Sequence, residues 1–241
     1  MKSLLLAALL AVVTLVTAAQ TDKPDVASPA DQGQPANPGS SDDASTAAKP
    51  SLLKPLKPQT QEEPYAPIRL RQRLRWFITN TIGPPHLVAG LFTAGFGTAV
   101  DRPEEYGPHW GGFADRYGMR MTGIVTGNAM EASIGALWGE DPRYFRVPDR
   151  GFKERLRNVA RLTFLARQED GSFGLAYARY IAVSGNNFLS NTWRPHSEAN
   201  TEDALFRIGE GFAGRMGANA FEEFWPDIKS HVFHKSRSGD D

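Results

Sequence analysis

The sequence has no cysteine, no excess charge of either sign and, after its first residues, no apolar run long enough for a membrane span. Without cysteine the chain cannot form disulfides or carry a lipid on an N-terminal cysteine, so an exported form depends on its packed core. The 27 basic and 27 acidic residues give a formal net charge of zero. This balance lacks the electrostatic footprint of a nucleic-acid-binding protein.

The N-terminus has the three parts of a secretory signal peptide. Lys2 supplies a positive charge, residues 4–16 form an apolar run, and small residues end the segment at Ala19. This pattern predicts a signal peptide over residues 1–19, cleaved before Gln20, and an exported protein of the periplasm or envelope. The alternative is an uncleaved anchor, although the run is shorter than the roughly 20 residues of a spanning helix.

Residues 20–67 have a different composition from the rest of the chain. They contain nine of the 17 prolines and almost no large apolar residue before Leu52. Such a segment buries too little surface to offset the entropy of ordering it. We therefore predict a disordered, Pro-rich linker over residues 20–67, and a short disordered tail over residues 236–241.

Residues 68–235 predict one compact all-α domain. Apolar residues recur with helical spacing, as at Leu70, Leu74, Phe77 and Ile78 in the first expected helix, and strand-type alternation is scarce. Prolines and glycines mark the ends of the segments. The expected helices cover residues 69–82, 84–100, from 110 or 113 to 138, 151–168, 173–192 and much of 202–224.

Glycine recurs at helical spacing inside two of these expected helices. Gly123, Gly127, Gly135 and Gly139 lie at multiples of four residues, and small residues have the same spacing within residues 87–100. Glycine inside a helix costs about 1 kcal/mol relative to alanine, so we expect compensation from close helix packing. Residues 87–100 make only about 21 Å of helix, against about 30 Å of hydrocarbon. We predict that this stretch is a buried helix.

A buried polar cluster is the main candidate site. Glu131 interrupts the glycine stripe, so its carboxylate is expected either to pair with Arg179 or Arg120, or to act chemically. Asn187 and Asn191 share a face of the helix that carries Arg179, where they either line a polar pocket or hold the following loop. The predicted cluster comprises Glu131, Arg179, Asn187 and Asn191.

Two expected helices carry basic residues on both sides of an apolar stripe. Such flanks are typical of helices that bind anionic lipid at a membrane surface. The alternative is that both stripes face the core and the basic side chains face water. The candidate lipid-facing residues are Arg69, Arg71, Arg73, Arg75, Lys153, Arg155 and Arg157.

Motifs for cofactor chemistry are weak in this chain. The glycines at 209, 211 and 214 match the dinucleotide fingerprint, but neither a preceding strand nor a following half-domain is expected. The five histidines lack the spacing of a metal site. We predict no catalytic residue, no metal site and no cofactor.

The motifs EDPRYFR, NTWRP and FWPDI resemble those of a group of uncharacterised bacterial exported proteins with no established activity. The resemblance implies export and a single domain, and it assigns no catalytic residue. Three functions stay open: a non-enzymatic binding or structural module of the envelope, a peripheral membrane protein that binds anionic lipid, and a hydrolase that uses Glu131 with a histidine. The partner is unknown; a membrane surface or an envelope protein is expected, and nucleic acid is not.

Overall fold

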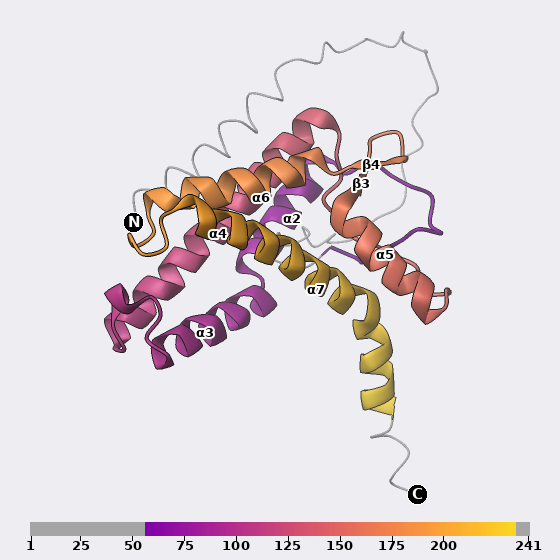
Figure 1. The fold of residues 1–241 in the computed structure, drawn as a ribbon. Helices are drawn as coiled ribbons and strands as arrows, with labels where there is room; N and C mark the ends of the chain where they lie inside the picture. Colours follow the sequence, from indigo (N-terminus) through magenta and orange to yellow (C-terminus); the bar gives the residue numbers. More distant parts are fainter. Residues whose placement is uncertain (1–55, 235–241) are drawn as a thin grey trace, which may run out of the picture.

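The computed structural model of the protein describes residues 56–234, and most of these residues are helical (Figure 1). The expected signal peptide, residues 20–55 of the expected linker and the expected tail lie outside the described residues. The predicted compact helical class is confirmed. The helices are α2 (Leu70–Ile82), α3 (Pro84–Ala99), α4 (Trp110–Trp138), α5 (Phe152–Phe164), α6 (Tyr177–Leu189) and α7 (Thr201–His234).

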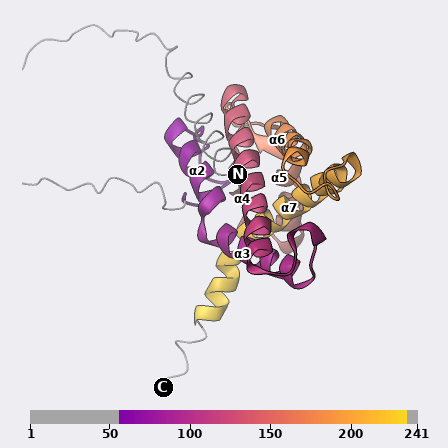
Figure 2. The same cartoon turned by 90° about the vertical axis from the view of Figure 1, so that its left-hand side faces the viewer.

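Helix α4 is the central element of the fold. It packs against α2, α3 and α6, while α7 packs across α5 and α6 (Figures 1 and 2). It ends at Trp138 as predicted, and it begins at Trp110, the first of the two expected starts. The His109 side chain accepts a hydrogen bond from the Gly112 N–H at the first turn, and Gly139 closes the helix in the left-handed conformation at φ 73°.

Two short strand pairs correct the sequence-based prediction. Strand β1 (Gln59–Thr60) pairs in parallel with β2 (Phe145–Arg146), so residues 56–67 do not belong to a disordered linker. Strands β3 (Leu165–Arg167) and β4 (Phe173–Leu175) form an antiparallel hairpin in segments that were expected to be helical. Gly171, at φ 83°, makes the turn between them. Strands this short depend on their partner, which periodicity along the chain does not reveal.

The apolar core has two parts. One lies between α2 and α4 and includes Leu74, Phe77 and Ile78 of the predicted stripe, but not Leu70; the other surrounds β2 and α5. The buried residues are Trp76, Phe77, Val125, Ala129 and Ala132 in the first part, and Tyr144, Phe145, Val159 and Leu162 in the second.

Glycine allows close packing along α4, as predicted. A Cβ atom at Gly127 would lie 3.2 Å from the Asn186 side chain of α6. At Gly135 it would lie 2.9 Å from the Arg73 guanidinium and 3.1 Å from the Glu140 carbonyl oxygen. The neighbours therefore occupy the space of the missing side chains.

Helix α3 contradicts the prediction of a buried helix. Within residues 87–100 only Gly90 and Ala94 are buried, and the large apolar side chains of this stretch are mostly exposed. The reason is that α3 packs mainly against α4 alone. None of the helices within residues 56–234 has the length and apolar character needed to cross a membrane.

Candidate functional site

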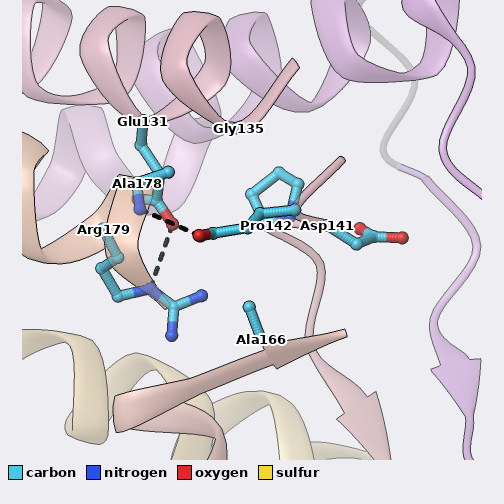
Figure 3. Close-up of a pocket in the computed structure, with 8 residues that line it drawn as sticks. Glu131, Gly135, Asp141, Pro142, Ala166, Ala178 and Arg179 are labelled. Atoms are coloured by element: carbon cyan, nitrogen blue, oxygen red, sulfur yellow. Dashed lines mark hydrogen bonds and ion pairs between the residues drawn. The ribbon is translucent and has the colours of Figure 1, made fainter. Parts of the chain in front are cut away.

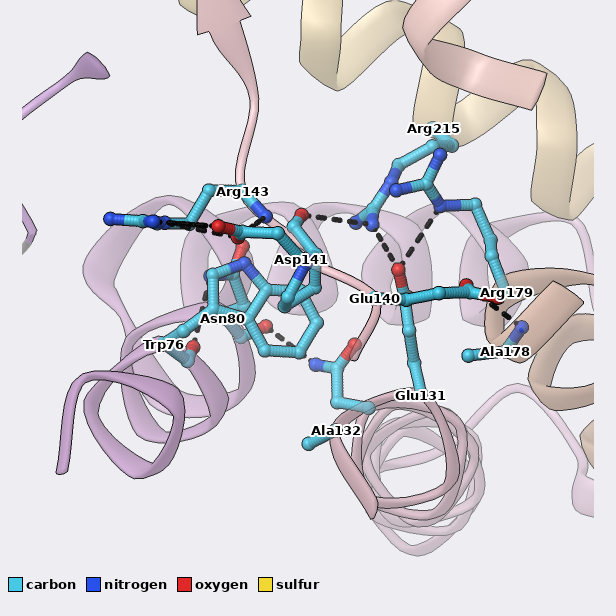
Figure 4. A network of polar contacts seen from close by, with 12 residues as sticks. Trp76, Asn80, Glu131, Ala132, Glu140, Asp141, Arg143, Ala178, Arg179 and Arg215 are labelled. Atoms are coloured by element: carbon cyan, nitrogen blue, oxygen red, sulfur yellow. Dashed lines mark hydrogen bonds and ion pairs between the residues drawn. The ribbon is translucent and has the colours of Figure 1, made fainter. Parts of the chain in front are cut away.

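Glu131 lies buried between two arginines. Its Oε1 atom accepts a 3.0 Å hydrogen bond from Nε of Arg179 and another hydrogen bond from Nη2 of Arg215 (Figure 3 shows Arg179; Figure 4 shows both). The predicted pairing with Arg179 is correct, whereas Arg120 is not a partner. Arg215, on α7, was not predicted, because only the tertiary fold brings α7 beside α4.

The two arginines are themselves held by main-chain oxygens. Arg179 Nη1 donates to the carbonyl oxygens of Leu162 and Thr163 at 2.7 and 3.0 Å, and Arg215 reaches the Pro142 carbonyl oxygen. Burial lowers the pKa of Arg215 to about 10, an effect that neighbouring Arg179 reinforces and Glu131 opposes. Arg215 therefore stays charged at neutral pH, and the cluster holds one carboxylate between two cations.

A second ionic layer surrounds this cluster at the C-terminal end of α4. Arg73 donates to the Glu140 carbonyl oxygen at 2.8 Å, and Arg143 pairs with Asp141 at 2.6 Å (Figure 4). A side-chain oxygen of Glu140 accepts the Ala178 N–H at 3.0 Å, and burial raises the pKa of that carboxyl. These contacts join α2, α4 and α6 and the segment after α4 into one network.

The geometry gives Glu131 a structural role. The small space beside Glu131, Pro142 and Ala178 has no room for a water molecule (Figure 3). No histidine contact to Glu131 is recorded within residues 56–234, and no group of three potential metal ligands occurs there. Both guanidinium contacts are to Oε1, so Glu131 serves as the internal counter-ion of Arg179 and Arg215.

Asn187 and Asn191 do not belong to the Glu131 cluster, which corrects the prediction of one four-residue site. Asn191 accepts from Arg207 at 2.5 Å and donates to the Asn200 carbonyl oxygen at 3.1 Å. Asn187 donates to the Val183 carbonyl oxygen within its own helix, and its carbonyl oxygen accepts from Arg207. Asn191 therefore holds the loop before α7, which is the second of the two predicted roles, whereas the Asn187 side chain bonds only within its own helix.

A third buried ionic group centres on Glu223 of α7 and was not predicted. Its carboxylate accepts from the Tyr144 hydroxyl at 2.9 Å and pairs with Arg155 at 3.0 Å. Arg146 donates to its main-chain oxygen. The partners lie 68 to 79 residues away in sequence, so no local pattern signals this group.

The candidate lipid-facing residues divide into two groups. Arg73 and Arg155 belong to the interior networks described above, so for them the lipid-facing prediction is wrong, and Arg75 is partly buried and takes part in interactions. The remaining four are exposed to solvent. They are Arg69, Arg71, Lys153 and Arg157.

An exposed apolar surface on α3 and the start of α4 was missed by the sequence analysis. We call it the α3 surface; it comprises Val88, Leu91, Phe92, Phe96 and Trp110, of which Phe92 is 76% and Trp110 85% exposed. Helix α3 carries no acidic or basic side chain apart from the half-buried His86. The absence of charge within residues 87–100 was the available signal, but it was interpreted as burial.

Specific contacts hold α3 against α4. A Cβ atom at Gly90 would lie 3.0 Å from the Tyr117 ring. At the other end, Arg116 donates to the carbonyl oxygens of Arg102, Pro103 and Gly107 and pairs with Asp101 at 3.1 Å. The α3 surface is therefore presented on a well-anchored helix.

Comparison of the chain with family models, curated proteins and solved structures gives no match. The resemblance to exported bacterial proteins accordingly remains a prediction from the three motifs.

Proposed function

We propose that this chain is an exported, non-enzymatic protein of the cell envelope that acts by binding at a membrane surface. The observation that carries the proposal is the distribution of side chains. Charged residues such as Glu131, Arg179 and Glu223 are buried and form ion pairs within the chain. Many large apolar side chains are exposed instead, and Phe92, Phe96 and Trp110 are each more than 60% exposed.

This distribution favours binding over catalysis. The buried acids Glu131 and Glu223 serve as partners for arginines, which gives these carboxylates a structural role. Exposed apolar patches of this kind are typical of surfaces that bind a membrane or another protein. The N-terminal signal-peptide pattern supports export to the envelope, where the protein would encounter membrane surfaces.

Co-sedimentation with vesicles tests the proposed function. The protein recovered from the exported fraction is mixed with phosphatidylcholine vesicles, or with vesicles that also contain phosphatidylglycerol, at about 0.1 M and about 1 M salt. We expect binding to both vesicle types, with little loss at high salt because the exposed surface is apolar rather than basic. Protein that stays in the supernatant under all four conditions would refute the proposal.

Fractionation of the producing cells gives an independent check. We expect the protein in the membrane fraction, with partial release by detergent rather than by high salt. Recovery only in the soluble periplasm or the medium would favour the other envelope role, in which the exposed surface binds a protein.

A further inference from the structure

We infer that the α3 surface is the element that enters the membrane, with α3 lying in the plane of the bilayer and its outer face in the acyl-chain layer. This inference rests on the proposed function and specifies its contact surface. Helix α3 is 16 residues long, or about 24 Å, which is shorter than the roughly 30 Å hydrocarbon core. A helix of this length suits an in-plane position at the boundary between headgroups and acyl chains.

The polar groups of α3 are already satisfied inside the helix. Thr93 Oγ1 donates to the Ala89 carbonyl oxygen, and Thr98 Oγ1 donates to the Ala94 carbonyl oxygen at 2.8 Å. Hydroxyls that are bonded in this way do not need a water partner. The free energy of desolvating them is therefore small when the outer face enters lipid.

The shape of the exposed arc favours lipid over a second protein. Viewed down the helix axis, with about 100° between successive residues, the exposed positions of α3 lie on one arc of roughly 200° that is bounded by Leu91 and Thr93. A helix that packs on one partner helix buries a narrower stripe, typically little more than about 100°. Fluid acyl chains can cover a convex arc of this width, whereas one copy of a helix cannot.

The border of the α3 surface also fits a membrane interface. Trp110, at the first turn of α4, stacks edge-on against Phe113, whose ring in turn lies near Gly95 of α3. Tryptophan is favoured at the boundary between headgroups and acyl chains. Beyond the end of α3, exposed Arg102, Glu104 and Glu105 mark the polar side of that boundary.

Quenching by brominated lipid tests this inference in the full chain. Five tryptophans are present, so the contribution of Trp110 is obtained by comparison with the Trp110→Phe variant. We expect lipids brominated on the acyl chains to quench Trp110 emission. The Trp138→Phe variant is the control, because Trp138 is also exposed but lies at the opposite end of α4.

Substitution on α3 gives the second readout. Phe92→Ser and Phe96→Ser are each expected to lower the vesicle partition coefficient about tenfold or more, since each removes a large apolar side chain from lipid. The matched control is Phe206→Ser on α7, where the side chain is 69% exposed. Both α3 variants should keep the unfolding temperature of the parent, because these side chains have few contacts to lose.

The outcomes separate the inference from the proposed function. Vesicle binding that survives Phe92→Ser and Phe96→Ser, or that falls equally with Phe206→Ser, overturns the inference but leaves membrane binding intact. A dimer in lipid-free solution that Phe92→Ser dissociates also overturns it, because a second copy would then cover α3. Absence of vesicle binding by the parent chain overturns both.

Discussion

The two ends of α4 have opposite surroundings. Its C-terminal half places Glu131 among arginines inside the molecule, whereas its N-terminal half supports α3, whose large apolar side chains point outward. Each arrangement needs a partner: the buried carboxylate has its partners within the chain, and the α3 surface calls for one outside it.

The comparison also shows why position along a helix is a poor guide to burial. Glycine allows a neighbour to come close in both halves of α4. In the N-terminal half, Gly90 of α3 lies against Tyr117, and in the C-terminal half, Gly127 lies against Asn186 of α6. Close approach on one face leaves the opposite face free. Whether that face is covered depends on how many other elements pack around it: α6 packs along α4, whereas α3 packs mainly against α4 alone.

The largest effect is expected from Glu131→Ala. The substitution leaves Arg179 and Arg215 buried without their carboxylate, which should lower the free energy of unfolding by about 3–5 kcal/mol. Chemical denaturation measures this loss. The control is Glu210→Ala, an exposed acid on α7, for which we expect a change within about 0.5 kcal/mol. A similar small loss for Glu131→Ala would contradict the paired interior.

Two phenylalanines sharpen the contrast between core and exposed surface. Phe77→Ala removes a side chain that is 4% exposed, and we expect a loss of about 3–4 kcal/mol in unfolding free energy. Phe92→Ala removes one that is 76% exposed, and we expect a change within about 0.5 kcal/mol. Thermal unfolding of both variants in the absence of lipid provides the test. Equal losses would mean that α3 is covered in solution.

Gly127→Leu is expected to destabilise the protein by about 1–3 kcal/mol, because the new side chain meets Asn186. The matched control is Gly217→Leu on α7, where no atom lies within 4 Å of the added Cβ. There the higher helix propensity of leucine should leave stability unchanged or raise it by up to about 1 kcal/mol. Unfolding temperatures compare the pair, and a stable Gly127→Leu variant would refute the close-packing account.

The smallest effect concerns pH. Burial lowers the pKa of His86, and the nearby cations Arg120 and Arg215 lower it further. The imidazole of His86 therefore binds a proton more readily in the unfolded chain than in the folded one. As the pH drops below the unfolded-state pKa of about 6.5 toward the lower folded-state pKa, the free energy of unfolding should fall. Unfolding free energies between pH 5 and pH 8 for the parent and for His86→Gln measure the difference. Parallel curves for the two proteins would contradict the assigned shift.

Several features followed directly from the sequence. Gly139 located the end of α4, its start was one of two expected residues, and the glycine stripe correctly indicated close packing at Gly127 and Gly135. Of the two roles expected for Glu131, pairing with an arginine is the one found, and Arg179 was one of the two candidates. These features depend on local propensity or on the high cost of leaving a buried charge alone, and both can be evaluated from the sequence.

Other features were decided only by the tertiary structure. The apolar character of residues 87–100 predicts removal from water, but it does not distinguish a protein core from a membrane, and only the packing of α3 on α4 showed which side is open. Arg73 and Arg155 resemble their exposed neighbours in sequence, yet distant segments fold over them. Burial is a property of the whole arrangement of helices, because a side chain is covered by residues that are far from it along the chain.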